Sequence, residues 1–219
     1  MSEQEGDHEQ VPPSWSADEQ LTTNGTGRAV CVESLGKALK VHGFRLAVAE
    51  SCTGGLLAAT LTDQPGISAW FEGGWITYSN RAKQRDLGVP ATLFTEVGAV
   101  SEEVVTAMAE GALTRAEVEY AIAISGVAGP GGGSEAKPVG TVFIGWSHQS
   151  GETPDGSRPG QLETFVARFR FPGDRLAVRE AAVDVALRGL CAHLAGETWD
   201  EASAANWSES FWPEAGLKL

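Results

Sequence analysis

The sequence lacks the features that mark several large classes of protein. Its 219 residues include only three cysteines, Cys31, Cys52 and Cys191, and their spacing matches neither a disulfide framework nor a zinc ribbon. No run approaches the roughly 18 consecutive apolar residues of a membrane span. The acidic start, MSEQEGDHEQ, has neither the basic nor the apolar part of a secretory signal. We therefore expect a protein of the reducing cytoplasm with no membrane partner.

Basic residues are also scarce, since 16 Lys and Arg stand against 29 Asp and Glu. A nucleic-acid-binding protein needs a basic stripe to neutralise phosphates, and none is visible, so we expect no nucleic-acid partner. The ends hold most of the negative charge, with six acids and no base over 1–27, and five acids and one lysine over 196–219. We predict one domain over 28–195, a disordered tail over 1–27 and a second acidic tail over 196–219.

Three tryptophans leave the character of the C-terminal tail open. Trp199, Trp207 and Trp212 fall within it, although aromatic residues are rare in disordered segments. Docking of part of this segment on the domain or on a partner is therefore a second possibility beside a solvated tail.

Hydrophobic periodicity gives an alternation of helices and strands. Helices are predicted over 28–42, 56–63, 79–88, from Ser101 onward, and 175–194; strands are predicted over 44–50, 75–78, 120–125, 141–147 and 162–171. The last two strands form a hairpin. This order favours a three-layer α/β/α sandwich with a mixed, mostly parallel sheet.

Two glycine-containing loops follow predicted buried strands, where α/β proteins gather their ligands. The first is SCTGG at 51–55. Ser51 is a candidate nucleophile, with N–H groups of Thr53, Gly54 and Gly55 as candidate oxyanion donors at the start of a helix. The competing interpretation, and the commoner one on spacing alone, is that Ser51 or Thr53 caps this helix.

A serine nucleophile needs a base, and histidine does not supply one here. The motif G-x-S-x-G is absent, and His8, His42, His148 and His193 all lie outside the glycine-rich loops. A lysine with a lowered pKa can serve instead. Lys83 and Lys137 are the candidates, although an isolated lysine on a polar helix is usually a solvated surface residue.

The second loop, 126–140, contains GVAGPGGGSEAKPVG. It matches neither named phosphate-binding motif and is either a phosphate cradle or a loop of tight turns. Arg175 and Arg179 are one helical turn apart and form either a phosphate clamp or ordinary pairs with Asp174 and Glu180. No cluster has the spacing of metal ligands, so we predict no metal and no cofactor.

Taken together, these segments resemble the CinA C-terminal domain family, whose stand-alone members are nicotinamide-nucleotide amidohydrolases. The matching stretches, in order, are AVAESCTGG (47–55), PGISAWFEGGWITYSNRAK (65–83), LGV (87–89), GAVSE (98–102), AISGVAGPGGGSEAKPVGTV (123–142) and FPGDRLAVR (171–179). Their order and spacing together are specific, and the resemblance covers about residues 28–195. The chain looks like the short, stand-alone form.

The resemblance implies an α/β/α fold, a homodimer, and hydrolysis of nicotinamide mononucleotide to nicotinic acid mononucleotide and ammonia in pyridine nucleotide recycling. It implies a catalytic set of Ser51, Lys83 and Tyr78. It also implies that Gly126, Gly129 and Arg175 bind the nucleotide substrate. Two other functions stay open: a non-catalytic nucleotide-binding or regulatory module, and an amidase for a different small amide.

Overall fold

The computed structural model describes residues 25–150 and 160–209. The chain begins with α1 (Gly25–His42), β1 (Leu46–Glu50) and α2 (Leu56–Thr62), followed by a short 3-10 turn (Ile67–Ala69) and β2 (Phe71–Ile76). Three helices come next: α3 (Asn80–Leu87), α4 (Ala91–Glu96) and α5 (Glu102–Ala116). The rest comprises β3 (Tyr120–Gly126), β4 (Thr141–Ser150), β5 (Gln161–Arg170), α6 (Arg175–Leu194) and α7 (Glu201–Glu209).

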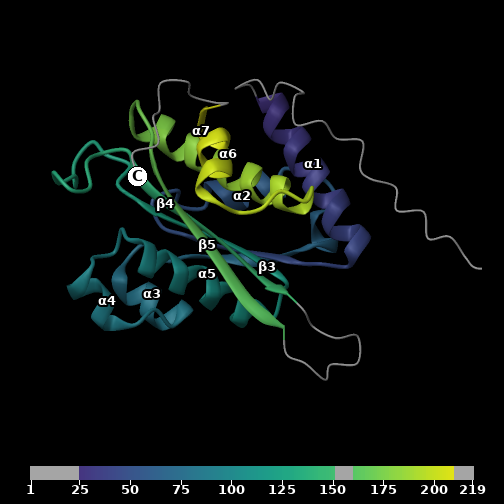
Figure 1. Cartoon of the computed structure of the whole chain (residues 1–219), viewed down its shortest axis with the longest axis horizontal. Coiled ribbons are helices and arrows are strands. Elements are labelled where there is room, and N and C mark those ends of the chain that lie inside the picture. Colours follow the sequence, from purple (N-terminus) through teal and green to yellow (C-terminus); the bar gives the residue numbers. More distant parts are fainter. Residues whose placement is uncertain (1–24, 151–159, 210–219) are drawn as a thin grey trace, which may run out of the picture.

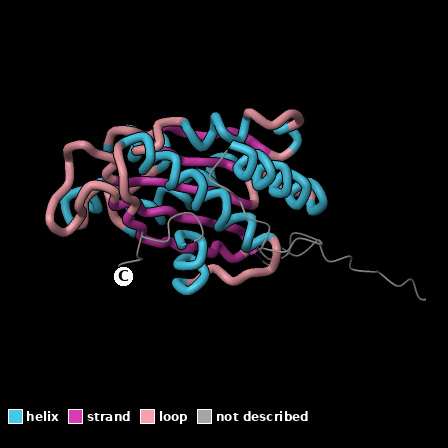
Figure 2. Tube along the Cα trace, turned by 90° about the horizontal axis from the view of Figure 1, so that it is seen from above, coloured by secondary structure: helices cyan, strands magenta, loops and turns pink. Residues whose placement is uncertain are grey.

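A single five-stranded sheet in the order β2-β1-β3-β4-β5 forms the middle layer. β2, β1 and β3 pair in parallel, whereas β4 is antiparallel to both of its neighbours. Four strands therefore point one way and β4 points the other. Helices α3, α4 and α5 cover one face, and α1, α2, α6 and α7 cover the other (Figures 1 and 2). The predicted three-layer α/β/α fold with a mixed, mostly parallel sheet is confirmed.

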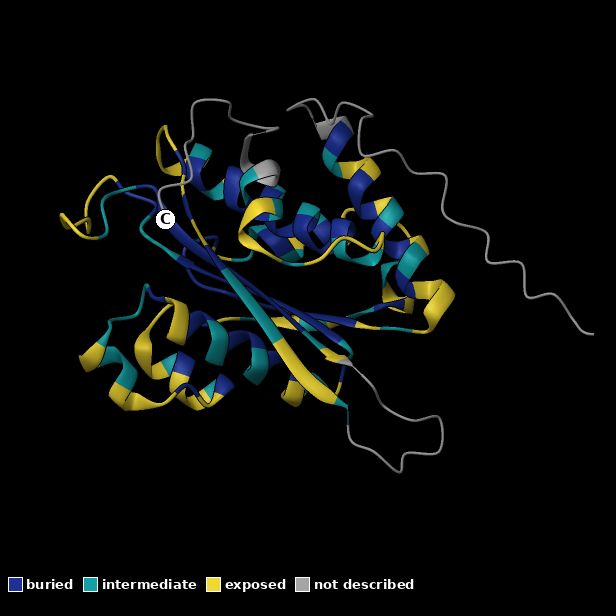
Figure 3. Cartoon of the chain, in the orientation of Figure 1, coloured by how far each residue is buried: buried dark blue, intermediate teal, exposed yellow. Residues whose placement is uncertain are grey.

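Burial on both faces explains the composition of the central strands. Every residue of β1 is buried. Figure 3 shows buried strands in the middle of the sheet, in dark blue, whereas the edge strand β5 is partly exposed. A strand covered on both sides reads as a continuous apolar run rather than an alternating one. β1 follows this rule in Leu46–Ala49 and breaks it once, at Glu50, which is fully buried at the carboxyl end of the strand.

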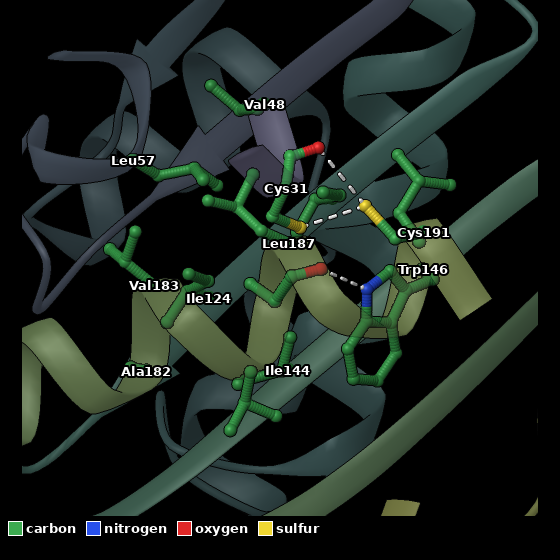
Figure 4. Packing of buried hydrophobic residues seen from close by; sticks show 14 of the residues in the cluster. Cys31, Val48, Leu57, Ile124, Ile144, Trp146, Ala182, Val183, Leu187 and Cys191 are labelled. Atoms are coloured by element: carbon green, nitrogen blue, oxygen red, sulfur yellow. Dashed lines mark hydrogen bonds between the residues drawn. The ribbon is translucent and has the colours of Figure 1, made fainter. Parts of the chain in front are cut away.

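The larger of the two cores lies between the sheet and α1 and α6. Trp146 of β4 is fully buried there, and its indole N–H donates to the Ala186 carbonyl at 2.8 Å (Figure 4). In the same core the thiols of Cys31 and Cys191 lie 2.9 Å apart, and both cysteines are free. A second core, between the sheet and α5, packs α3 and α4 against the other face.

Most predicted elements match the structure to within a few residues, with two differences. β2 starts at Phe71, four residues before the predicted strand, and ends at Ile76. Its Gly74 is needed because a Cβ there would lie 2.5 Å from the Val48 side chain of β1. Gly74 therefore marks a close approach of β2 to β1. The short helix α4 was not predicted.

Both predicted tails need adjustment where the structure describes them. Residues 1–24 lie outside the described part, and α1 begins at Gly25, inside the predicted tail over 1–27. In the C-terminal segment, α7 is helical and Trp199 docks on the domain. The Trp199 indole N–H donates to the Gly189 carbonyl at 3.0 Å, and its ring stacks on His193 at 3.8 Å between centroids. The side chain of Trp207 and the whole of Trp212 lie outside the described part.

Candidate active site

The candidate site lies at the carboxyl ends of the three parallel strands. The register sets Glu50 of β1 opposite Ile76 of β2 and Ile124 of β3. The next residues continue this pairing, since the Thr77 N–H donates to the Glu50 carbonyl at 2.8 Å and the Ser51 N–H to the Ile124 carbonyl at 3.0 Å. Ser51 and Thr77 are therefore neighbours at the carboxyl end of the strands, although they are far apart in sequence.

Lys83 extends from α3 to Ser51 and Thr77 at the carboxyl end of these strands. Ser79 caps that helix by accepting the Ala82 N–H, and the buried face of the helix carries Lys83 and Leu87, one turn apart. Only 1% of Lys83 is exposed. Its Nζ lies 2.9 Å from the Ser51 Oγ and donates to the Thr77 carbonyl at 2.6 Å. The lysine therefore occupies a core position, and its amine meets the serine hydroxyl.

Burial changes the acid–base character of this amine. Desolvation penalises the charged form and lowers the pKa of Lys83 from 10.5 to about 8. A neutral amine has two N–H groups and one lone pair. One N–H satisfies the Thr77 carbonyl, and the lone pair is then available to accept the Ser51 proton. The geometry and the lowered pKa together suit Lys83 to act as a general base near neutral pH.

The two residues after Ser51 are weaker candidates for the nucleophile. Burial raises the pKa of the Cys52 thiol to about 11, which keeps it protonated, and the thiolate is the reactive form. Thr53 is fully buried, and its hydroxyl has no hydrogen-bond partner in the described structure. Only Ser51, among these three, contacts a base.

The helix that follows is not capped by Ser51 or Thr53, which removes the competing interpretation of the hydroxyls. The carboxylate of Glu50 accepts the N–H groups of Gly55 at 2.9 Å, Leu57 at 3.2 Å and Ala58 at 2.9 Å. The Gly54 N–H donates to the Ser51 carbonyl at 3.1 Å. The Gly54 and Gly55 N–H groups, predicted as oxyanion donors, are thus occupied within the turn. Sequence reasoning missed Glu50, and the signal for it was an acid ending an otherwise apolar strand.

Positive backbone φ angles explain why this turn needs two glycines. Gly54 has φ +59° and Gly55 has φ +93°, a region that other residues adopt only with strain. The two glycines give the turn its shape, which directs Ser51 toward Lys83 and the Glu50 side chain toward the start of α2.

A second group of predicted residues meets beside this turn. Arg175, at the start of α6, donates to the Gly129 carbonyl at 2.7 Å and to the Tyr78 hydroxyl at 3.1 Å. Tyr78 is 61% exposed, and in the described structure it forms no hydrogen bond with Ser51 or Lys83. The structure therefore joins Tyr78 to the arginine and the glycine-rich loop rather than to the Ser51–Lys83 pair.

Arg179 links this second group to the nucleophile turn. Its guanidinium donates twice to the Thr53 carbonyl, at 2.7 and 3.2 Å. Arg175 and Arg179 both line an open cavity of about 650 Å³. The other lining residues are Ala128, Pro130, Val139, Gly173, Asp174 and Leu176. Asp174 caps α6 through its own side chain, and within the described residues neither arginine pairs with it or with Glu180.

Two sequence candidates lie outside this arrangement. Gly126 ends β3, where a Cβ would come within 2.8 Å of the Thr141 carbonyl, and it does not line the cavity. Lys137 donates its amine to the Val97 carbonyl at 2.7 Å, away from Ser51. Lys83 is therefore the lysine that the fold brings to the serine.

Among the residues that the structure describes, neither a metal ligand set nor a membrane span accompanies the site. Over 25–150 and 160–209, no three His, Cys, Asp or Glu side chains come close enough to hold a metal ion. In the same residues, no helix has the length and apolar character needed to cross a membrane.

Comparison with known proteins shows which family the chain belongs to. The family model for the CinA C-terminal domain matches residues 29–194. The chain belongs to the CinA C-terminal domain family. The match covers the site described above and most of the predicted domain over 28–195.

Individual members of the family are close in sequence and in fold. The nicotinamide-nucleotide amidohydrolase PncC of Pseudomonas putida is 52% identical over 156 residues, which is 71% of this chain and 90% of the relative. The PncC protein of Escherichia coli K12 is 48% identical over 158 residues, 72% of this chain and 89% of the relative. The crystal structure of a CinA superfamily protein from Klebsiella pneumoniae superposes with a TM-score of 0.68 at 40% identity, covering 78% of this chain and 99% of that one.

Proposed function

We propose that this CinA-family protein is a nicotinamide-nucleotide amidohydrolase, which converts nicotinamide mononucleotide to nicotinic acid mononucleotide and ammonia in pyridine nucleotide recycling. The observation that carries this proposal is the buried contact between the Lys83 amine and the Ser51 hydroxyl. It supplies a nucleophile and a base for amide hydrolysis. The amidohydrolase name of relatives about 50% identical to this chain supports the substrate.

In the proposed mechanism, neutral Lys83 takes the proton of Ser51 while Oγ attacks the carboxamide carbon. The carbonyl π pair moves to oxygen. When the tetrahedral intermediate collapses, the C–N bond breaks and the nitrogen takes the proton from Lys83, leaving as ammonia. Lys83, neutral again, deprotonates a water that attacks the acyl carbon of the acyl-enzyme. The bond between this carbon and Ser51 Oγ then breaks, Oγ takes the proton back from Lys83, and nicotinic acid mononucleotide leaves. Each proton that Lys83 accepts is returned within the same half-reaction.

The oxyanion needs a donor that the turn does not already use. Of the three N–H groups predicted from the sequence, those of Gly54 and Gly55 are occupied. The Thr53 N–H has no acceptor among the described residues, so we assign this role to it. Because Thr53 is fully buried in this structure, the substrate must displace the atoms that cover this N–H. Losing one such donor typically costs about 100- to 1,000-fold in rate.

The cavity beside the turn suits the 5′-phosphate of the substrate. Arg175 and Arg179 place two cations on its wall, and guanidinium groups bind phosphate with paired hydrogen bonds. The contacts of Arg175 with Gly129 and Tyr78 fit a role for all three residues in substrate binding. Tyr78 then orients substrate or relays a proton to the departing nitrogen from the cavity side. Gly126 serves by letting β3 and β4 pack closely behind the loop.

An ammonia-release assay with nicotinamide mononucleotide, nicotinamide and NAD tests the proposal. Release from the mononucleotide alone, abolished in Ser51→Ala, is the expected result. Release from a different amide identifies the protein as another amidase. If none of the three releases ammonia while the mononucleotide still binds, the protein is a binding module, and the proposed function is wrong.

The proposal also includes the oligomeric state and the cellular compartment of the protein. We propose a homodimer of the cytoplasm, acting on a small nucleotide. The presence of three free, buried cysteines supports a reducing setting. Light scattering of the purified chain at several concentrations tests the dimer, and a mass of 23.0 kDa at all of them would exclude it.

A further inference from the structure

Glu50 is a fully buried carboxylate one residue before the proposed nucleophile. A buried charge is costly unless hydrogen bonds compensate it. Here three backbone N–H groups do so: Oε2 accepts from Gly55 and Leu57, and Oε1 accepts from Ala58. Both oxygens are used. The carboxylate also faces the positive end of the α2 backbone dipoles.

The backbone of Glu50 is tied to the other half of the catalytic pair. Its carbonyl accepts the Thr77 N–H at 2.8 Å, and the Thr77 carbonyl accepts from Lys83 Nζ at 2.6 Å. One residue thus connects through its side chain to α2, beyond the Ser51 turn, and through its main chain to the residue that orients Lys83.

We infer that Glu50 is a positioning residue for the Ser51–Lys83 pair. Its main chain, bonded to Thr77, holds the first end of the turn 51–55, and its side chain holds the last end by accepting the N–H groups at the start of α2. Together these bonds set the direction in which Ser51 Oγ points. The Glu50 carboxylate also occupies the N–H groups at the start of α2, which could otherwise bind an anion of the substrate. We therefore expect that anion to bind Arg175 and Arg179. The inference rests on the proposed function only in taking Ser51 as the nucleophile.

Glu50→Gln is the sharpest test because it keeps the size of the side chain. An amide has one acceptor end and one donor end, so at least one of the three N–H groups then faces another N–H. Glu102→Gln is the matched control, since Glu102 is an exposed acid in the first turn of α5. Both variants are made in the full chain, and circular dichroism and thermal melting establish that they fold.

The readout is the reactivity of Ser51 toward phenylmethanesulfonyl fluoride, measured by mass spectrometry of the labelled peptide. In this reaction the Oγ–S bond forms, fluoride leaves, and the serine proton goes to Lys83. We expect Glu50→Gln to label at least about tenfold more slowly, from the loss of a charge-assisted hydrogen bond. Glu102→Gln should label at the wild-type rate. With nicotinamide mononucleotide, kcat should fall in Glu50→Gln while KM stays within about twofold.

Amide hydrogen exchange gives a second readout that needs no variant. The Gly55 N–H precedes α2 and has the Glu50 side chain as its acceptor, so we expect it to exchange slowly in the wild type. Rapid exchange at Gly55, equal labelling of Ser51 in a folded Glu50→Gln, or a wild-type Ser51 that resists the reagent would each overturn the inference. Slower labelling without any ammonia release from the mononucleotide would support Glu50 and refute only the proposed substrate.

Discussion

Replacing Lys83 by methionine should abolish activity and yet stabilise the protein at neutral pH. Burial lowers the pKa of this lysine from 10.5 to about 8, which corresponds to about 3 kcal/mol at about 1.4 kcal/mol per pKa unit. At pH 7 the folded protein carries this cost in full, because the amine is mostly protonated in both states. Methionine removes it but loses the bonds to Ser51 and Thr77, at about 1 kcal/mol each. The net gain is about 1 kcal/mol.

The difference in stability between Lys83→Met and the wild type should change sign with pH. Between about pH 8 and 10.5 the unfolded chain binds more protons at Lys83 than the folded chain does, so wild-type stability rises with pH across this window. Near pH 10 the desolvation cost falls below about 1 kcal/mol, and Lys83→Met should become the less stable protein.

Urea denaturation of both proteins at pH 7 and pH 10 measures the free energies of unfolding. Turnover by Lys83→Met should fall at least about 100-fold. A variant that is less stable than wild type by the same amount at both pH values would refute the argument that Lys83 is desolvated.

Three further outcomes follow from the packing. Gly111→Ala should lower stability by about 1–3 kcal/mol, because a Cβ there would lie 2.1 Å from the Leu87 carbonyl of the helix that carries Lys83; a melting temperature equal to wild type would contradict this. Trp199→Ala should release α7, seen as faster amide exchange over 201–209, and leave turnover unchanged, since Trp199 contacts Gly189 and His193 far along α6 from the cavity. Native protein should react with no equivalent of a thiol reagent, against three in denaturant, because all three cysteines are buried; rapid reaction of any native thiol would show that the core opens.

The layered fold could be predicted from the sequence because local patterns mark most of its helices and strands. The periodicity over 175–194 predicts α6 with the bounds it has in the structure, and Ser101 marks the start of α5 as its N-cap. Local patterns failed where a tertiary contact set the residue type. Gly74 looks like a strand breaker, but the close approach of Val48 requires it.

The catalytic contact was not accessible from local pattern. Ser51 and Lys83 meet because β1 and β2 pair in parallel with Glu50 opposite Ile76, and no spacing rule contains that register. On composition alone α3 is a polar, solvated helix, and only packing on α5 shows that Lys83 lies on its buried face. The resemblance to the CinA C-terminal domain family supplied this pair. It did not supply Glu50, whose role depends on the N–H groups that its carboxylate accepts in the folded structure.

The Lys83 amine should lose its proton at a pH close to neutral, as a base acting on the Ser51 hydroxyl must, and the titration of Lys83 itself tests this most directly. Labelling the lysine ε-carbons with carbon-13 and following their chemical shifts by NMR gives the pKa of each lysine, with Lys83→Met identifying the resonance. We expect the titration of Lys83 to have its midpoint at about pH 8. A midpoint at the ordinary value of 10.5 would contradict it.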